Sequence, residues 1–243
     1  MEKFYKLIQR QRIDPRIWDF SYFLLKNNFY VFKQFRDLVV RENKLRILDV
    51  GCGFKPWLRM FDKNRVEYIG VDFDKEKSEA DFIASAGKLP FPDNDFDALI
   101  YSEVLEHTEN LAGAVKEMRR VAKNNALIYI SVPFVFPEHG IPYDFQRLTR
   151  YFYQKAFQDD EIVLIKESNS SLSTAFVSFN LFIEATPFSI LRGFKHLIYI
   201  LNNAIGMAAD MAVRTGLKII GNRFKEQFYS MPLGYALVIR IKK

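Results

Sequence analysis

One segment constrains the fold of this chain more than any other: Arg46-Ile-Leu-Asp-Val-Gly-Cys-Gly-Phe-Lys-Pro56. Its first half predicts a buried strand, Ile47–Val50, which runs directly into a glycine turn, and Pro56 stands where a following helix would begin. In open α/β sheets, ligands bind in the crevice at the carboxyl ends of the strands, where Asp49 and the glycines fall. Because glycine has no Cβ, the backbone there can approach a ligand closely. The segment therefore predicts a turn that cradles a nucleotide.

Strands and helices alternate after this segment. Apolar runs predict strands at residues 66–72, 98–102, 126–133 and 161–166, a further unit occupies 80–86, and helical patterns fall at 57–62, 111–121 and 150–157. Such alternation implies a parallel, doubly wound sheet. The chain has 243 residues, 49% of them hydrophobic, which is enough for one elaborated domain with a substantial core.

Asp72 ends the second expected strand, 23 residues beyond Asp49. In nucleotide-binding βαβ units, an acid near that distance accepts hydrogen bonds from the ribose hydroxyls, since a carboxylate can take two donors at once. The alternative is a surface carboxylate that caps a turn. The spacing favours the ribose contact.

Charge and cysteine usage bear on compartment and partners. The single Cys52 excludes an intrachain disulfide, the charged N-terminus shows no signal peptide, and no segment offers the ~20 apolar residues of a membrane span, so we expect a cytoplasmic protein. The net charge of +6 is uneven: residues 1–46 carry 11 basic and 5 acidic side chains, residues 47–184 carry 15 and 22, and residues 185–243 carry 9 and 2. The basic ends are either solvated faces or contacts for an anionic partner such as a lipid surface, a pyrophosphate-linked substrate or nucleic acid.

Five motifs in order carry a family resemblance. They are Ile47-Leu-Asp-Val-Gly-Cys-Gly53, Asp72, Leu89-Pro-Phe-Pro-Asp-Asn-Asp-Phe-Asp97, Glu103-Val-Leu-Glu-His107, and Arg120-Val-Ala-Lys123 before a strand that ends in Pro133. Over residues 45–165 the chain resembles the class I S-adenosylmethionine-dependent methyltransferases of the type 11 group. A hydride-transferring dehydrogenase fits worse, because the glycine turn lacks the third glycine of a dinucleotide fingerprint.

The resemblance implies a Rossmann-like α/β sheet of about seven strands with an antiparallel last strand at residues 233–241. It divides the chain into a helical N-terminal extension (1–43), a methyltransferase domain (44–169 plus 229–243) and a helical insertion (170–228). We expect the extension to pack on a sheet edge or to roof a pocket. In the insertion, apolar residues recur at helical spacing among Lys and Arg, at Leu197, Leu201, Ala204, Ala208 and Met211. It is a lid, a homodimer contact, or a membrane-surface helix that reaches a lipid-linked substrate.

The cofactor residues follow from the same resemblance. It implies that S-adenosylmethionine binds with its methionine moiety among Asp49, Gly51 and Gly53 and with its ribose at Asp72. The predicted cofactor site also includes Cys52, Phe73, Ser85, Ala86 and Ser102. The chain departs from the family at two positions. Lys55 follows the glycines where a small residue is common, and Ser85 replaces an acid that contacts adenine.

A metal site is the first candidate for chemistry beside the cofactor. Glu103, Glu106 and His107 stand at i, i+3 and i+4, so a helical turn would place all three on one face. The Glu-x-x-Glu-His pattern resembles a divalent-metal site of methyltransferases in ubiquinone biosynthesis and at small-RNA 3′ ends, which implies that these three residues bind a divalent metal. Such a metal would ease deprotonation of a bound hydroxyl. The alternative is a structural helix start, with the carboxylates at the positive end of the helix dipole and His107 packed beneath.

The loop Phe134–Thr149 is the second candidate, because it leaves the end of a strand that faces the cofactor crevice. The imidazole of His139 could accept a proton near neutral pH, Asp144 could orient it, and Arg147 could clamp an anionic group. The loop resembles methyltransferases of surface-polysaccharide and glycan biosynthesis, which implies catalytic roles for these three residues together with His107. The alternative is that Asp144 and Arg147 pair only to brace the loop.

These features predict transfer of a methyl group from S-adenosylmethionine to a hydroxyl of a glycan or a lipid-linked acceptor. The protein would then be cytoplasmic or peripheral on the inner face of the membrane. One alternative is a methyltransferase-like scaffold without catalysis, suggested by Lys55 and Ser85. Another is an RNA methyltransferase, which only the basic ends support, so nucleic acid is not the favoured partner.

Overall fold

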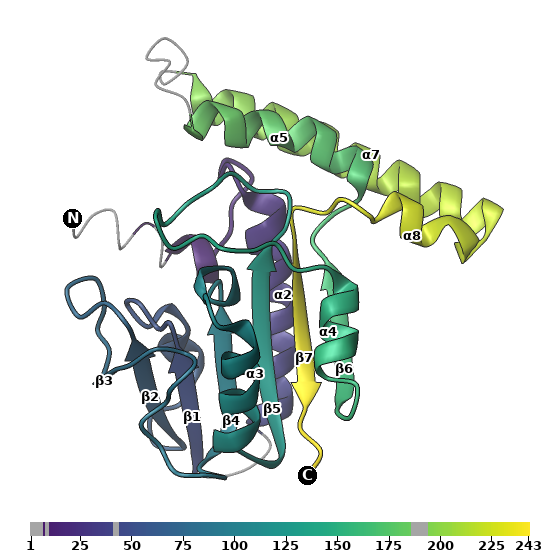
Figure 1. Ribbon diagram of the computed structural model, residues 1–243. Coiled ribbons are helices and arrows are strands. Elements are labelled where there is room, and N and C mark those ends of the chain that lie inside the picture. Colours follow the sequence, from purple (N-terminus) through teal and green to yellow (C-terminus); the bar gives the residue numbers. More distant parts are fainter. Residues whose placement is uncertain (1–6, 8–9, 41–43, 186–193) are drawn as a thin grey trace.

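A seven-stranded sheet forms the centre of the computed structural model, which describes residues 7, 10–40, 44–185 and 194–243 (Figure 1). The strands are β1 (Leu45–Val50), β2 (Val66–Asp72), β3 (Phe82–Ile83), β4 (Phe96–Ser102), β5 (Ala122–Pro133), β6 (Glu161–Glu167) and β7 (Gly234–Arg240). They lie in the order β3-β2-β1-β4-β5-β7-β6. Strands β1 to β5 are parallel, and β7 runs antiparallel to both of its neighbours. The predicted Rossmann-like doubly wound sheet with an antiparallel last strand is confirmed.

The helices complete the described part of the chain. They are α2 (Tyr22–Val39), α3 (Leu111–Val121), α4 (Arg150–Ala156), α5 (Ser171–Ala185), α7 (Lys195–Ile220) and α8 (Lys225–Phe228), with 3-10 turns η1 (Pro56–Met60), η2 (Leu105–His107) and η3 (Asn222–Phe224). The predicted extension and insertion fall partly on residues 1–6, 8–9, 41–43 and 186–193, which lie outside the described residues.

Helices α3 and α4 cover one face of the sheet. The Asn110 side chain accepts a hydrogen bond from the Gly113 N–H (2.9 Å) and so caps the start of α3. Within α3, Ala114, Met118 and Val121 recur at helical spacing and are fully buried against the sheet. This packing explains why the alternating pattern of residues 96–133 folds as a βαβ unit.

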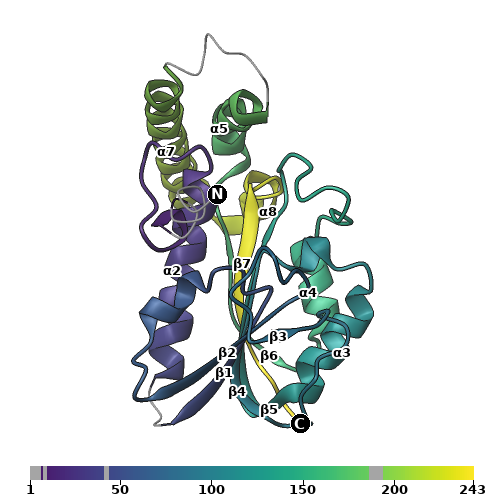
Figure 2. The same ribbon diagram turned by 90° about the vertical axis from the view of Figure 1, so that its left-hand side faces the viewer.

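Helix α2 from the N-terminal extension covers the opposite face (Figure 2). The Phe32 ring stacks on Trp57 with centroids 3.9 Å apart and lies edge-on to Tyr129 of β5. The extension was expected at a sheet edge or over a pocket. Helix α2 lies on a sheet face and not at an edge, because β1 is followed by the single turn η1, which leaves this face open. The apolar stripe of α2 buries that surface instead. Residues before α2, such as Arg10 and Trp18, line a cavity, in keeping with the second alternative.

The register brings the carboxyl ends of the central strands to one level. Val50 pairs with Val71 of β2 and with Tyr101 of β4. Therefore the residues that follow these strands meet at one edge of the sheet, where an open α/β sheet binds ligands.

Helices α5 and α7 form an antiparallel pair above this edge (Figures 1 and 2). We call this pair the hairpin. Within the described residues, no helix is both long and apolar enough to cross a membrane.

Candidate active site

The glycine turn after β1 takes a left-handed backbone. Gly51 has φ +66°, Gly53 has φ +48°, and Lys55 has φ +47°. A Cβ on Gly51 would lie 2.4 Å from a methyl carbon of Val104, so only glycine fits at this position. A Cβ on Gly53 would meet nothing within 4 Å. The turn therefore packs closely on one side and is open on the other, as a ligand cradle requires.

Two carboxylates flank this turn. Asp72 accepts hydrogen bonds from the Gly53 N–H (2.9 Å) and the Asp74 N–H (3.1 Å), and its remaining lone pairs can accept further donors. Asp49 is buried, and the Tyr68 hydroxyl donates a hydrogen bond to it (2.5 Å). Burial raises the pKa of Asp49 to about 7, although the Tyr68 hydrogen bond acts in the opposite direction. A cationic group beside Asp49 would favour its ionised form.

Lys55 is engaged outside the turn. Its ammonium lies 2.7 Å from Asp81, just before β3, and Asp81 also accepts a hydrogen bond from the Gly70 N–H (2.7 Å). Both contacts hold the pKa of Asp81 below its usual value against the effect of burial. A lysine is thus accommodated beside the glycines because a carboxylate neutralises it.

The other predicted cofactor residues lie along the same edge. Phe73 is exposed, and its ring centroid is 5.6 Å from that of Tyr143. Ser85 and Ala86 follow β3, with Ser85 exposed and Ala86 half-buried. Cys52 is buried, which raises the pKa of its thiol.

Arg12 reaches this edge from the extension and was missed by the sequence analysis. Its guanidinium donates to the hydroxyl (3.2 Å) and the carbonyl (3.4 Å) of Ser102, the last residue of β4. Ser102 is buried, 3.3 Å from the Ser131 hydroxyl of β5. No motif spacing links Arg12 to the glycine turn, so only the folded chain could reveal this contact.

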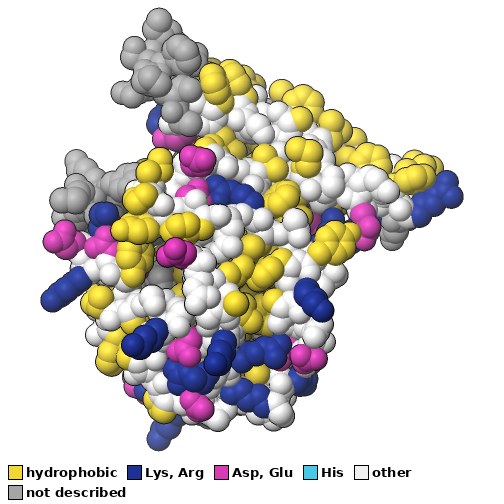
Figure 3. Space-filling model, in the orientation of Figure 1, with side chains coloured by type: hydrophobic (Ala, Val, Ile, Leu, Met, Phe, Trp, Pro, Cys, Tyr) yellow, Lys and Arg dark blue, Asp and Glu magenta, His cyan; other side chains and the backbone are white. Residues whose placement is uncertain are grey.

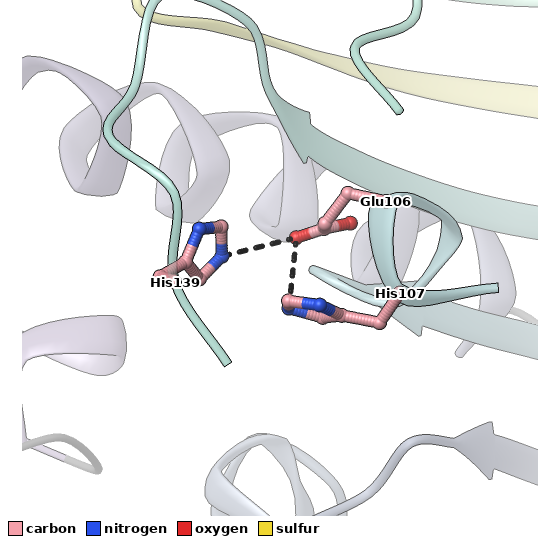
Figure 4. Close-up of side chains that lie close together, drawn as sticks. All are labelled: Glu106, His107 and His139. Carbon is pink, nitrogen blue, oxygen red and sulfur yellow. Dashed lines mark ion pairs between the residues drawn. The ribbon is translucent and has the colours of Figure 1, made fainter. Parts of the chain in front are cut away.

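A glutamate and two histidines converge after β4 and β5 (Figure 4). Nε2 of His107 and Nε2 of His139 each lie 3.8 Å from Oε1 of Glu106. One potential ligand atom from each residue falls within 4.8 Å of the other two. Glu106 and His107, which were predicted as metal ligands, are therefore joined by His139. His139 lies 32 residues after His107 in the chain and was predicted only as a base.

The hydrogen bonds of the two imidazoles assign their protons. Nδ1 of His107 lies 2.5 Å from the carbonyl oxygen of Tyr143, and Nδ1 of His139 lies 3.2 Å from that of Pro137. Since a carbonyl can only accept, each Nδ1 carries a hydrogen, and in the neutral form of the ring each Nε2 presents a lone pair to Glu106. This arrangement is typical of histidines that bind metals.

Glu106 itself is fully buried, and neither carboxylate oxygen has a hydrogen-bond partner among the described residues. Burial raises its pKa to about 7. Two lone pairs and an unpartnered carboxylate that face one another suit a cation between them. The donor set of two imidazoles and one carboxylate therefore fits a divalent metal.

Glu103 stands apart from this cluster. It directly follows β4 and has φ +58°, and the 3-10 turn begins only at Leu105, so the expected helical face of three ligands does not form. Its Oε1 accepts a hydrogen bond from the Asn28 amide (3.0 Å), and burial together with the nearby Glu106 charge raises its pKa to about 7. The left-handed residue turns the chain before a helical turn can include this carboxylate.

Asp144 and Arg147 brace the loop that carries His139. The Arg147 guanidinium donates to both oxygens of Asp144 (2.5 and 2.8 Å) and lies 3.4 Å from the carbonyl oxygens of Phe136 and Pro137. Asp144 accepts from the His139 backbone N–H (2.9 Å). This pairing holds the pKa of Asp144 well below its usual range. The geometry favours a bracing role for the pair over direct contact with a substrate.

A cavity of about 640 Å³ adjoins these groups. Its lining includes Ser102, Glu103, His107 and His139. Trp18 lies in the wall, and the hairpin contributes Glu184, Lys195, His196 and Tyr199. The cavity therefore connects the polar cluster with the hairpin.

Comparison with known proteins gives this arrangement a family context. Residues 48–130 match the family model described as a methyltransferase domain, of the type 11 group. This stretch of the chain is therefore similar to a methyltransferase domain. An uncharacterised protein of Methanocaldococcus jannaschii is 33% identical over 97 residues, which are 37% of this chain and 43% of that protein. The uncharacterised methyltransferase YcgJ of Bacillus subtilis is 30% identical over 113 residues, 41% of this chain and 42% of that protein. The chain spans about half the length of the curated relatives it matches, with 43% and 57% covered in two of them.

Solved structures extend the likeness in fold beyond the residues that the family model matches. The crystal structure of B. subtilis YcgJ aligns with a TM-score of 0.53 at 17% identity and covers 88% of this chain and 98% of that chain. A SAM-dependent methyltransferase from Archaeoglobus fulgidus aligns with a TM-score of 0.52 at 15% identity, over 98% of this chain and all of that one (100%). At these identities the likeness establishes the fold alone, a Rossmann-like α/β sheet.

Proposed function

We propose that this protein is an S-adenosylmethionine-dependent methyltransferase that methylates a hydroxyl of a glycan or a lipid-linked acceptor. The observation that carries the proposal is the cluster of Glu106, His107 and His139 beside the methyltransferase-type glycine turn. The cavity that joins the cluster to the hairpin supports an acceptor with a sizeable apolar part.

The glycine turn and its two acids fit the cofactor. Asp49 would pair with the methionine ammonium, Asp72 would accept from the ribose hydroxyls, and the open side of Gly53 leaves room for the ligand. Exposed Phe73 offers an aromatic surface beside Asp72 for the adenine. When bound, S-adenosylmethionine supplies an electrophilic methyl on a sulfonium, and the protein needs only to align the acceptor with it.

Deprotonation of the acceptor hydroxyl would be the role of Glu106, His107 and His139. A divalent metal held by these residues would act as a Lewis acid that makes the hydroxyl easier to deprotonate. Glu106 can also hold a proton near neutral pH, since burial raises its pKa to about 7. Arg147 and Asp144 keep the His139 loop in position.

Calorimetric titration with S-adenosylmethionine and S-adenosylhomocysteine tests the cofactor part of the proposal. We expect binding by the wild type, and about tenfold weaker binding by Asp72→Ala, which loses the ribose acceptors. No binding by either protein would refute the methyltransferase proposal.

The acceptor part needs a separate assay. Purified protein, labelled S-adenosylmethionine and glycolipid or lipid extracts should yield a product heavier by about 14 daltons, one CH₂ unit. The Glu106→Gln variant should bind the cofactor as the wild type does yet transfer the methyl group far more slowly. Cofactor binding without product from any hydroxyl acceptor would refute this part while leaving the domain assignment intact.

A further inference from the structure

The contact between the helices of the hairpin is unusually polar. Asn180 of α5 and Asn203 of α7 are fully buried, and the Asn180 amide donates to the Asn203 side-chain oxygen (3.1 Å). The Asn202 amide donates in turn to Asn180 (2.8 Å). Below them, Asp210 accepts from both the N–H (2.8 Å) and the hydroxyl (2.5 Å) of Ser170. Polar side chains therefore hold the pair together from inside.

The outer surface of the hairpin is apolar. Large hydrophobic side chains at least 37% exposed recur along both helices, at Leu172, Phe176, Phe179, Phe182, Leu197, Leu201, Ile205, Met207, Met211, Ile219 and Ile220. Phe179 and Phe182 stack on one another on the surface, with centroids 5.9 Å apart. Figure 3 shows hydrophobic side chains along the upper side of the hairpin and Lys or Arg side chains at its far end.

A helix pair in water buries its apolar residues and exposes its polar ones. The hairpin buries apolar residues too, such as Val177 and Leu217. It departs from that pattern because it also buries Asn180, Asn203 and Asp210 and leaves large apolar side chains exposed along both helices. It matches helix pairs in lipid, where small and polar side chains join the helices and apolar ones face outward. Gly206 provides the close approach, because a Cβ there would lie 3.0 Å from Ser173 and Val177 of α5. Since neither helix can span a bilayer, the pattern suits a pair that lies in the membrane interface.

Cations accompany the apolar surface. Lys26 of α2, Lys166 of β6 and Arg214 of α7 line one cavity of about 380 Å³ beside the hairpin. Asp210 is the carboxylate in this lining, and its Oδ1 already accepts two hydrogen bonds from Ser170. Lys166 also lies over the Tyr30 ring (3.7 Å), and burial and the two other cations lower its pKa. Bringing three cations together is unfavourable unless an anion joins them, so the cavity suits a phosphate.

Further cations lie where the hairpin ends. Lys218 belongs to the last turn of α7, and Arg223 and Lys225 follow it, all exposed. Among the described residues of α5 and α7, the carboxylates are Glu184, which pairs with Lys195 and Tyr199, and the buried Asp210. The surface therefore complements a negatively charged layer with an apolar interior.

We propose that the hairpin lies flat on an anionic bilayer, with its outer phenylalanine and leucine side chains at the acyl boundary and a lipid phosphate in the cavity of Lys26, Lys166 and Arg214. The cavity that reaches His139 has Glu184, Lys195 and Tyr199 of the hairpin in its lining. A lipid-linked acceptor could therefore enter it from the bilayer, a consequence that rests on the proposed function.

Vesicle co-sedimentation tests the docking without any methyl transfer. We expect the wild-type protein to sediment with vesicles of phosphatidylglycerol and phosphatidylcholine, and more weakly with phosphatidylcholine alone. The double variant Phe176→Ser/Phe179→Ser should bind at least about tenfold more weakly, because it loses two acyl contacts. The matched control is Tyr151→Ser, which removes a similarly exposed aromatic ring (57%) from α4 and should bind as the wild type does. Equal binding by wild type and double variant would overturn the proposal.

The phosphate site needs its own variant. Lys166→Gln should weaken binding to the anionic vesicles about fivefold and leave binding to phosphatidylcholine unchanged. Inorganic phosphate at 10 mM, on the order of ten times a millimolar affinity, tests whether the cavity binds a free anion. Suppose that phosphate raises the melting temperature of the wild type without vesicles, while Lys166→Gln binds vesicles as the wild type does. The cavity then holds a free anion, and its role in lipid binding is refuted.

Size-exclusion chromatography with light scattering separates the bilayer from a second copy of the chain. We expect a monomer in detergent-free buffer that still binds vesicles. A dimer that Phe176→Ser/Phe179→Ser converts to a monomer, together with no sedimentation by the wild type, would assign the apolar surface to self-association instead. The circular dichroism spectrum and cofactor titration of each variant confirm that it has folded.

Discussion

Asp49→Asn should stabilise the cofactor-free protein while removing its function. Asp49 is buried and its pKa rises from 3.8 to about 7 on folding, so the native state resists ionisation of this carboxyl. Each pKa unit corresponds to ~1.4 kcal/mol, so ionised Asp49 lowers the free energy of unfolding by roughly 4 kcal/mol at pH 8. At pH 5 the native carboxyl keeps its proton, and the penalty is only about 2 kcal/mol. The side-chain oxygen of asparagine can still accept the hydrogen bond from Tyr68, and because asparagine does not ionise, the variant has no buried charge to destabilise it.

The direction in which wild-type stability changes with pH follows from the number of protons bound in the native and unfolded states. Between pH 4 and pH 7, by the approximate pKa values, the native state holds more protons at this site than the unfolded state, so wild-type stability falls as pH rises through this window and is level above it. Thermal unfolding of both proteins from pH 5 to pH 8 measures the difference. For a chain of this size, ~2–4 °C per kcal/mol predicts that the variant gains clearly more in melting temperature at pH 8 than at pH 5.

Asp81→Asn is the matched control, because Lys55 and the Gly70 N–H lower the pKa of Asp81. A carboxyl with a lowered pKa stabilises the fold above its unfolded value, so this variant should lose stability at pH 8 and lose less in acid. An Asp49→Asn gain in melting temperature that is the same at pH 5 and pH 8, or a shift of both variants in the same direction at pH 8, would refute the burial penalty at Asp49.

Cofactor titration completes the experiment. Asp49→Asn should bind S-adenosylmethionine about a hundredfold more weakly, since a buried charge-assisted hydrogen bond to the ammonium is lost. In the wild type, affinity should fall about tenfold from pH 8 to pH 6 as Asp49 takes up its proton. Affinity that does not change over this range would show that Asp49 does not meet the ammonium.

Three further predictions concern the turn, the metal cluster and the loop. Gly51→Ala should lower the free energy of unfolding by about 2–3 kcal/mol, because φ is +66° and the new Cβ would lie 2.4 Å from Val104; a melting temperature equal to wild type would contradict this. His139→Ala should remove the rise in melting temperature that Mn²⁺ gives the wild type, while both proteins melt alike in EDTA; a rise that persists would exclude His139 as a ligand. Arg147→Lys should lower kcat about tenfold with unchanged cofactor affinity, since lysine cannot donate to both oxygens of Asp144, and an equal kcat would refute the bracing role.

The central sheet could be predicted because its signals are local. Ile47–Val50, the strand ending at Asp72 and the helix at 111–121 each show their period within a few residues, and strand–helix alternation leaves few topologies. The fold places Asp49, Gly51 and Asp72 at one edge because parallel strands end together.

The metal cluster could be predicted only in part. Glu106 and His107 are neighbours in sequence, but His139 joins them through a loop whose path depends on the pairing of Asp144 and Arg147. Glu103 leaves the expected face because its backbone is left-handed, which sequence spacing does not reveal. Long-range contacts of this kind follow from packing and not from any periodic pattern.

The strand that runs into a glycine turn could be deduced from the amino-acid order alone, as could the order of the elements and the acids at the strand ends. Each of these depends on backbone geometry and burial over only a few residues. The folded chain was needed to show that α2 covers an open sheet face, that Arg12 reaches Ser102, and that the hairpin buries several polar side chains while it exposes large apolar ones. A helical pattern indicates which residues share a face of the helix, but it does not indicate which surface of the protein that face contacts. The partner of each face is set by which surfaces the rest of the fold leaves uncovered.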